Sequence, residues 1–382
     1  MPMKPPQRLT QKAILRYALQ GALFAVAAST GVVIFYSAPE TLEHLDDFNW
    51  WINGLLFGLI VSAWLLNGSR VYLLSRSLGY TLTYRQSLSV SLSSEFGIAA
   101  TPAGMGGAAI RLSLLKRAGI SWAHGTTMLA VDVVLDSIFF LLLVPFAAYS
   151  ILNNPKIRQT VSKIPPGGTL GLLLSLAVAG ILLGWAVRSR WFRRWIHTQC
   201  LRPGWRDYRL PARFRLLRWK VAHGWHQMKE GFRHLLGLKR GAVLLTFAVA
   251  SLQWTCRYSV LPILFYALSF PTDPVLLFLL QGFLFTASLF FVLPGGGGGV
   301  EVATAIILRQ IIKPSVVGVV VLLWRFFTYH LYLIGGGCMF FWTCARLPHV
   351  FPASPTAKEE VEIAFDDAPN PDSPPVCGGP GI

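Results

Sequence analysis

Charged residues are scarce in this sequence. They make up 13% of its 382 residues, while hydrophobic residues make up 53% and the mean hydropathy is +0.52. Apolar runs of about 20 residues recur along most of the chain, and a transmembrane helix needs runs of this length. The composition excludes an ordinary soluble globular protein and predicts an all-α polytopic membrane protein.

Cysteines and catalytic motifs are also scarce. The five cysteines show no CxxC or Cys/His spacing, so neither a disulfide framework nor a zinc site is indicated. There is no HExxH, GxSxG or Walker A motif, and the glycine run at 295–299 lacks the Lys-Ser/Thr of a phosphate-cradling loop. The eight histidines are scattered. We therefore expect no enzymatic activity, no cofactor and no metal site.

Acidic residues are half as frequent as basic residues, 17 against 34, which gives a net charge of +17. Most of the excess lies near the N-terminus and in residues 188–240. Loops rich in Lys and Arg stay on the cytoplasmic side of a membrane, so this basic loop is predicted to be cytoplasmic. An amphipathic helix lying on anionic lipid is an alternative role for the loop. We expect no nucleic-acid partner.

Six apolar segments are long enough to cross a bilayer core of about 30 Å. With the basic loop inside, counting the crossings places both termini in the cytoplasm. Residues 1–16 then form a basic cytoplasmic N-terminus, and the proline-rich, acidic tail 347–382 is expected to be disordered cytoplasmic chain. The predicted spans are residues 17–36, 49–75, 122–152, 167–187, 241–268 and 314–344.

Two further apolar stretches, 86–116 and 275–311, are interrupted near their middles by "TPAGMGGAA" and "LPGGGGGVE". Glycine costs about 1 kcal/mol relative to alanine inside a helix, so the chain should break there. Each half has about 15 residues, which is too short to span comfortably. We interpret both stretches as re-entrant helical hairpins. The expected tips contain Pro102, Gly104, Gly106 and Gly107 in the first hairpin, and Pro294, Gly295, Gly296 and Gly298 in the second.

The two breaks can be aligned with each other. When Pro102 is matched with Pro294, three glycines of the first break match glycines of the second, and Arg117 matches Arg309. A predicted span also precedes and follows each break. The sequence therefore predicts an internal duplication, with repeat one at about 49–152 and repeat two at about 241–345. An odd number of crossings separates the copies, which makes the repeat inverted, as in many transporters.

Seven of the charged residues inside the predicted membrane segments are candidate site residues, because ionisable groups there are costly and usually functional. Arg70 is nearer a cytoplasmic end, where its side chain can snorkel to the interface. We expect Glu301 to pair with Arg325 or Arg257, which leaves the other arginine for a lipid phosphate. The structural alternative is that such pairs only pin the hairpins in place. The candidates are Glu95 and Arg111 in hairpin one, Asp132 and Asp136 one turn apart in the next span, Arg257, Glu301 in hairpin two, and Arg325.

Three stretches, "TPAGMGGAAIRLSLLKRAGIS", "LPGGGGGVEVATAIIL" and "LLWRFFTY", resemble the lysylphosphatidylglycerol synthetase transmembrane family, also called flippase-like. The resemblance covers roughly 45–345. Family members have a proline-glycine motif with a downstream arginine, here Arg111, and a P-G-G-x-G-x-x-E motif that ends here at Glu301. The first motif departs from the pattern, because Gly107 and Ala108 stand where an acidic residue often follows; Glu95 is the candidate substitute.

The resemblance implies a flippase-like transmembrane domain at residues 17–346 that moves an anionic or modified lipid between leaflets of a bacterial inner membrane. About 37 residues follow the last span, too few for the aminoacyltransferase domain of the synthetases. One alternative is an accessory protein that presents lipid or docks a lipid-biosynthetic enzyme. A membrane-embedded lipid-modifying enzyme is disfavoured because no nucleophile is evident. The identity of the cargo and the energy source stay open.

Overall fold

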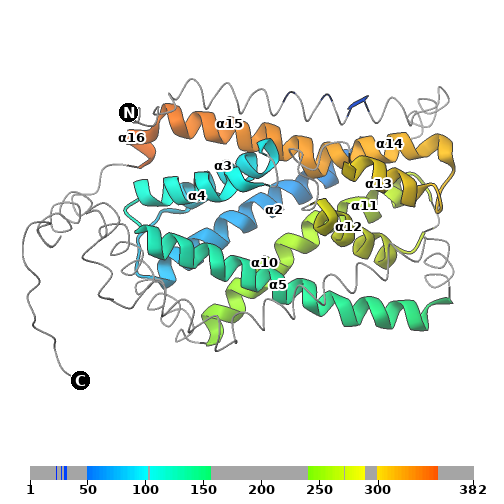
Figure 1. The fold of residues 1–382 in the computed structure, drawn as a ribbon, viewed down its shortest axis with the longest axis horizontal. Coiled ribbons are helices and arrows are strands. Elements are labelled where there is room, and N and C mark those ends of the chain that lie inside the picture. The colour runs from blue at the N-terminus through cyan, green and yellow to red at the C-terminus, as the bar shows by residue number, and fades with distance from the viewer. Residues whose placement is uncertain are drawn as a thin grey trace, which may run out of the picture.

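The computed structural model describes residues 23, 27, 30, 31, 50–101, 104–155, 240–270, 272–288 and 299–351. These residues form helices joined by short turns, and none of them lies in a β-strand (Figure 1). The predicted all-α class is therefore confirmed. The predicted span 167–187, the N-terminus 1–16, nearly all of the basic loop and most of the C-terminal tail lie outside the described residues, as does most of 17–36.

The helices fall into two groups with the same order: a long helical segment, two short helices, and a second long segment. A further short helix, α16 (Leu347–Val350), follows the second group, so the tail 347–382, which was predicted to be disordered, begins with a helix. The first group is α2 (Trp50–Ser77), α3 (Tyr84–Ala100), α4 (Met105–Arg117) and α5 (Trp122–Asn153). The second is α10 (Arg240–Tyr258), α11 (Val260–Ala267), α12 (Pro274–Ser288), α13 (Gly299–Leu308), α14 (Pro314–Arg325), the π-helix η5 (Phe326–His330) and α15 (Leu331–Ala345).

Among the described residues, three helices are long and apolar enough to cross a membrane: Trp51–Ser77, Trp122–Leu143 and Pro314–Ala345. They correspond to three of the six predicted spans. The predicted span 241–268 differs, because it is divided into α10 and α11 at Ser259. Pro262 accounts for the division, since its ring crowds the carbonyl four residues earlier and it has no N–H to donate.

The first predicted hairpin is a pair of short helices, α3 and α4, that pack on each other. The turn between them uses Gly104 at φ +70°, a conformation that glycine adopts without strain. Thr101 closes the turn: its hydroxyl donates to the Gly97 carbonyl at 2.7 Å and accepts from the Gly106 N–H at 2.8 Å. The two helix backbones come so close that a Cβ at Gly97 would lie 2.7 Å from the Gly106 carbonyl oxygen.

The second predicted hairpin also contains two short helices, α12 and α13, which pack against each other. The chain between them, including the predicted tip residues Pro294, Gly295, Gly296 and Gly298, lies outside the described residues. Glu301 lies in the first turn of α13, where the helix dipole favours a carboxylate.

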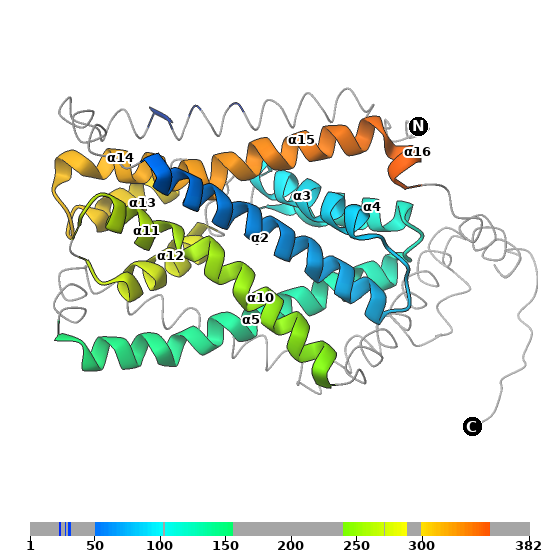
Figure 2. The ribbon, with the colours of Figure 1, turned by 180° about the vertical axis from the view of Figure 1, so that it is seen from behind.

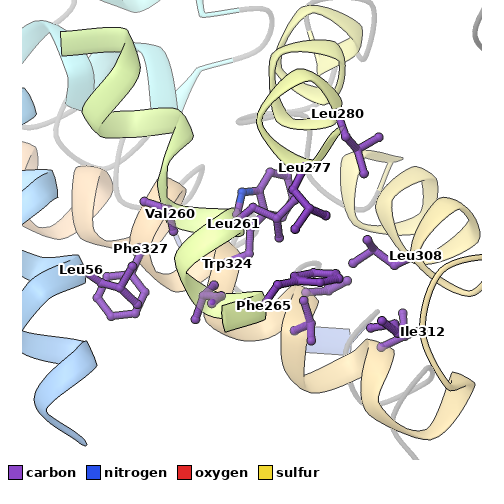
Figure 3. Packing of buried hydrophobic residues seen from close by; sticks show 14 of the residues in the cluster. Leu56, Val260, Leu261, Phe265, Leu277, Leu280, Leu308, Ile312, Trp324 and Phe327 are labelled. Atoms are coloured by element: carbon purple, nitrogen blue, oxygen red, sulfur yellow. The ribbon is translucent and has the colours of Figure 1, made fainter. Parts of the chain in front are cut away.

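The two groups pack together through corresponding elements. Helix α2 packs against α10, and α3 lies along α15 (Figures 1 and 2). An apolar core fills the junction of α2, α11 and α12 to α14; it contains Leu56, Leu261 and Phe265 (Figure 3). In contrast, α5 exposes large apolar side chains such as Ile138 and Leu141, as expected for a helix that faces lipid.

Candidate functional site

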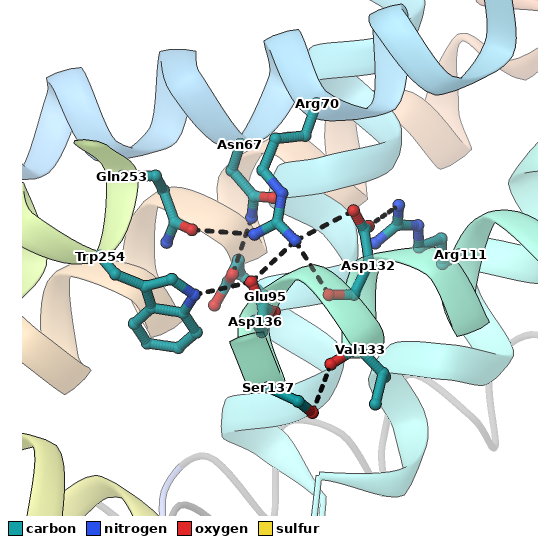
Figure 4. Close-up of polar contacts among 10 residues, drawn as sticks. All are labelled: Asn67, Arg70, Glu95, Arg111, Asp132, Val133, Asp136, Ser137, Gln253 and Trp254. Carbon is teal, nitrogen blue, oxygen red and sulfur yellow. Dashed lines mark hydrogen bonds and ion pairs between the residues drawn. The ribbon is translucent and has the colours of Figure 1, made fainter. Parts of the chain in front are cut away.

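Four charged side chains from α2, α4 and α5 form one group of ion pairs, which we call the Asp132 cluster: Arg70, Arg111, Asp132 and Asp136 (Figure 4). One oxygen of Asp132 lies 3.0 Å from Nη2 of Arg70, and its other oxygen pairs with Nη2 of Arg111. Asp132 is only 5% exposed. Two arginines on one carboxylate offset the large cost of burying its charge.

Asp136 lies one turn after Asp132 on the same face of α5, as its spacing predicts. Its Oδ1 is 2.9 Å from Nη2 of Arg70 and accepts a hydrogen bond from the indole N–H of Trp254 at 2.8 Å. The other terminal nitrogen of Arg70 donates to the side-chain oxygen of Gln253 at 3.0 Å. Because Gln253 and Trp254 belong to α10, the cluster joins the first group of helices to the second (Figure 4).

Glu95 is the second carboxylate that connects the two groups. The side-chain amide of Asn67 donates to its Oε1 at 2.9 Å, and Nη1 of Arg257 lies 3.5 Å from its Oε2. The guanidinium of Arg257 also lies 4.2 Å from the centre of the Tyr332 ring, which is a cation–π contact. Helices α2, α3, α10 and α15 therefore meet at Glu95.

Glu301 and Arg325 form a separate buried ion pair, with Nε of Arg325 2.8 Å from Oε1 of Glu301. Glu301 is 0% exposed, and within the described residues its Oε2 accepts no hydrogen bond. Arg325 also lies over the Tyr329 ring, 4.9 Å from its centre. The Tyr329 hydroxyl donates to the carbonyl of Ala99 at 3.0 Å, so this group reaches the turn of the first hairpin. Arg325 immediately precedes η5, and π-helical turns are frequent at functional sites.

All seven candidate residues are thus buried or half-buried members of interhelical ion pairs. The pair expected between Glu301 and Arg325 is present. Arg257, expected to be left for a lipid phosphate, contacts Glu95 instead. The expectation that Arg70 snorkels is wrong: it is 3% exposed and binds both acids of α5, because helix packing covers this part of α2.

Three polar residues complete these clusters, namely Asn67, Arg70 and Gln253; the sequence interpretation missed Asn67 and Gln253 and gave Arg70 only an interfacial role. A signal was present for the first two. They lie three residues apart in an apolar helix, so they share one face, and a polar face inside a predicted span indicates an interior contact. Gln253 has no comparable local signal, because its partner is 183 residues away in sequence.

The charged side chains of these clusters are of the types that bind anionic groups. In the described part of the chain, no group of three or more His, Cys, Asp or Glu side chains is placed to hold a metal ion. The charged side chains are held against one another, and each arginine can exchange a carboxylate partner for a phosphate of similar geometry. Such clusters can therefore hold or guide a polar headgroup.

Comparisons with known proteins find similarity over most of the chain. A UPF0104 membrane protein of Archaeoglobus fulgidus is 23% identical over 327 residues, which cover 81% of this chain and 92% of the relative. The family model described as the lysylphosphatidylglycerol synthase TM region matches residues 22–336. This match includes the first helix group, the second as far as the first part of α15, and every residue of the ion-pair clusters. The chain therefore belongs to the lysylphosphatidylglycerol synthase transmembrane-region family of membrane proteins.

Proposed function

We propose that this protein is a flippase-like transporter that moves an anionic or modified lipid between the leaflets of a bacterial inner membrane. The seven charged residues named above contact the headgroup or transmit the movement of the hairpins, and no covalent chemistry takes place. Family membership supports a lipid-related role, and the buried ion pairs between broken helices favour transport.

The observation that carries the proposal is the placement of these charges. Glu95 and Glu301 lie beside the breaks of the two short-helix pairs, and each is paired with an arginine on a long segment of the second group. Ionisable groups placed beside broken helices are typical of transporter binding sites. A purely structural membrane bundle gains little from such pairs, because burying them costs about as much as their attraction returns.

An inverted repeat with two re-entrant hairpins is part of this proposal. Two observations support it: the two groups share one order of elements, and their corresponding first segments, α2 and α10, pack against each other. Each group's first short helix also packs against the last long helix of the other group, α3 on α15 and α12 on α5. A pseudo-two-fold axis in the membrane plane would produce this exchange.

Lipid movement can be measured directly. The purified full chain is reconstituted in vesicles that contain a trace of acyl-labelled lipid, and dithionite is added to bleach only the outer leaflet. Transport predicts bleaching of nearly all the label, against about half in protein-free vesicles. Bleaching of half the label, with lipid binding intact, would overturn the proposal and favour the accessory role.

The orientation can be tested by single cysteines in a background that lacks the native ones. A cysteine at a position within 200–235 is expected to be protected from an impermeant reagent added outside intact cells. A cysteine at position 272 in place of Thr272 is expected to react. The reverse labelling pattern would contradict both the cytoplasmic basic loop and the inverted repeat.

A further inference from the structure

The last described residues of the chain pack against one end of the first helix group. Phe351 is 4% exposed and belongs to a buried apolar cluster with Leu74 and Leu115, to which the neighbouring ends of α2, α3, α4 and α5 contribute. The side-chain amide of Gln86, in the first turn of α3, donates to the Val350 carbonyl at 2.7 Å. Helix α16 lies beside the ends of α3 and α4 (Figures 1 and 2). The C-terminal tail therefore leaves the described structure at a defined place.

Five cationic side chains lie at this end of the molecule, and we call them the basic end face. They come from the helix ends that share the apolar cluster just described, and from the end of α15. All are exposed except Lys116, which is half-buried. Within the described residues, none of the five forms an ion pair. The five are Arg76 in the last turn of α2, Arg85 in the first turn of α3, Lys116 and Arg117 in the last turn of α4, and Arg346 directly after α15.

The carboxylates of the described residues lie elsewhere. Four of the five described acids form the interior ion pairs. The fifth, Asp273, caps the start of α12 and accepts a hydrogen bond from Asn154 at the far end of α5. Within the described part of the chain, the basic end face is therefore a concentration of positive charge without a counter-charge.

Helix dipoles account for most of these cations but not for Arg85. Arg76, Lys116 and Arg117 lie in the last turn of a helix and Arg346 directly follows one, where the negative end of the dipole favours a cation. Arg85 lies in the first turn of α3, where the dipole disfavours a cation and no acidic residue compensates it. A negatively charged partner beside Arg85 would offset this unfavourable interaction.

The segment that follows Phe351 has the complementary charge. Residues 352–382 contain six acidic residues and one lysine, and five of the acids fall within "EEVEIAFDD" at 359–367. Glu359 is the eighth residue after Phe351, and an extended chain of this length reaches about 28 Å. A helix with its side chains is about 10–12 Å across, so the acids can reach the neighbouring helix ends that carry the basic end face.

We propose that residues 359–367 dock on the basic end face. This contact continues the one that α16 and Phe351 already make with the same helix ends, and it brings five carboxylates to five cations. A tail bound there joins the ends of α2, α3 and α4 and so restrains the first hairpin. The inference concerns a surface of the chain itself and does not depend on the proposed transport.

Crosslinking measures the docking in detergent. In a variant that lacks the native cysteines, Thr81→Cys in the exposed loop between α2 and α3 is combined with Ala364→Cys, and a short bismaleimide is added. A protease site inserted after Pro355 then releases the tail from every chain that is not crosslinked. Docking predicts a tail that is retained at the mass of one chain. Asn153→Cys in place of Thr81→Cys should abolish retention, because it lies at the far end of α5, a helix about 48 Å long.

Charge substitutions test the partners. Arg85→Gln should slow the crosslinking about threefold, whereas Lys313→Gln, which removes an exposed cation at the start of α14 and at the opposite end of the molecule, should leave it unchanged. The triple substitution Glu359→Gln, Glu360→Gln and Glu362→Gln should slow it about tenfold. An increase in salt from about 0.1 M to about 1 M shortens the Debye length from about 10 Å to about 3 Å and should have a similar effect.

The other possible occupants give different results. Equal crosslinking rates in Arg85→Gln and Lys313→Gln, or rates that salt does not change, would overturn the inference. Retention of the tail only at the mass of two chains would assign the face to a second copy and would also overturn it. The experiment is repeated in nanodiscs of phosphatidylcholine and of phosphatidylglycerol. Crosslinking in both supports docking, and its loss in phosphatidylglycerol would assign the face to anionic headgroups and overturn the inference.

Discussion

The two halves of the molecule use ion pairs of opposite polarity at corresponding places. In the first half, the arginine is on the second short helix and the acid is on the long helix that follows, as Arg111 on α4 faces Asp132 on α5. In the second half the roles are exchanged, because Glu301 on α13 faces Arg325 on α14. In both halves the pair fixes a short helix to the segment after it.

The surroundings of the two pairs differ more than the pairs themselves. Asp132 shares its charge with a second arginine, Arg70, which also contacts Asp136, so the first half has a network that can redistribute its bonds. Glu301 is 0% exposed and pairs with Arg325, whose guanidinium also lies over the Tyr329 ring. We expect the second half to tolerate the loss of a charge far less well.

The largest effect is therefore expected at Glu301. Glu301→Gln removes a carboxylate that is 0% exposed and ion-paired with Arg325, and the loss of one partner of such a buried pair costs about 3–5 kcal/mol of unfolding free energy. Asp136→Asn should cost clearly less, because Arg70 retains Asp132. Reversible unfolding of both variants in detergent measures the difference, and equal losses would contradict the contrast between the halves.

The same pair can be tested for direct coupling. Once Arg325→Ala has removed the cation, adding Glu301→Gln should cost little, so the double-mutant cycle should be non-additive by more than about 1 kcal/mol. Transport of the labelled lipid should fall in both single variants. Additive losses of unfolding free energy would mean that the two side chains act independently, although Nε of Arg325 lies 2.8 Å from Oε1 of Glu301.

A smaller effect is expected at the hairpin turn. A Cβ at Gly106 would lie 2.6 Å from Cγ2 of Thr101 and 2.9 Å from the carbonyl oxygen of Gly97, so Gly106→Ala should destabilise the protein by about 1–3 kcal/mol. Gly58 in α2 is the matched control. No atom lies within 4 Å of a Cβ placed there, so Gly58→Ala should be neutral or stabilising by up to about 1 kcal/mol.

Gly298 extends this test to the second half, because the sequence alignment of the two breaks matches it with Gly106. If the halves correspond, Gly298→Ala should be destabilising by a similar amount. Thermal unfolding in detergent gives all three values. A neutral Gly298→Ala beside a destabilising Gly106→Ala would show that only the first hairpin depends on close backbone contact.

The smallest effect is expected at Tyr329, whose hydroxyl connects the second half to the first hairpin. Tyr329→Phe keeps the ring against Arg325 but removes the bond to the Ala99 carbonyl, which should cost about 1 kcal/mol. Tyr266, which is 79% exposed, provides the control substitution Tyr266→Phe. If Tyr329→Phe lowers the transport rate by more than its loss of unfolding free energy accounts for, this bond couples the two hairpins.

The sequence predicted the helical class and the position of the first break well, because both depend on local properties; the second predicted tip lies outside the described residues. Apolar length defines a helix such as Trp51–Ser77, and glycines with one proline interrupt the stretch that became α3 and α4. The prediction was less good for 241–268, where Pro262 alone was a weaker signal than a proline-glycine run. The partners of the charges were harder to predict, and Arg70 was assigned to the membrane interface although it is buried.

By itself, the sequence determined that segments such as Trp51–Ser77 are helical, that the stretch 86–116 is divided at its glycines, and which ionisable residues lie among apolar ones. These features follow from hydropathy and backbone conformational preference along the chain. Only the tertiary structure decided that Arg70 bridges Asp132 and Asp136 and that Arg257 meets Glu95. Those pairings depend on how far each helix is rotated about its axis and on which helices are neighbours. Both are set by close packing, such as the contact of α3 with α4 and α15, between residues far apart in the chain.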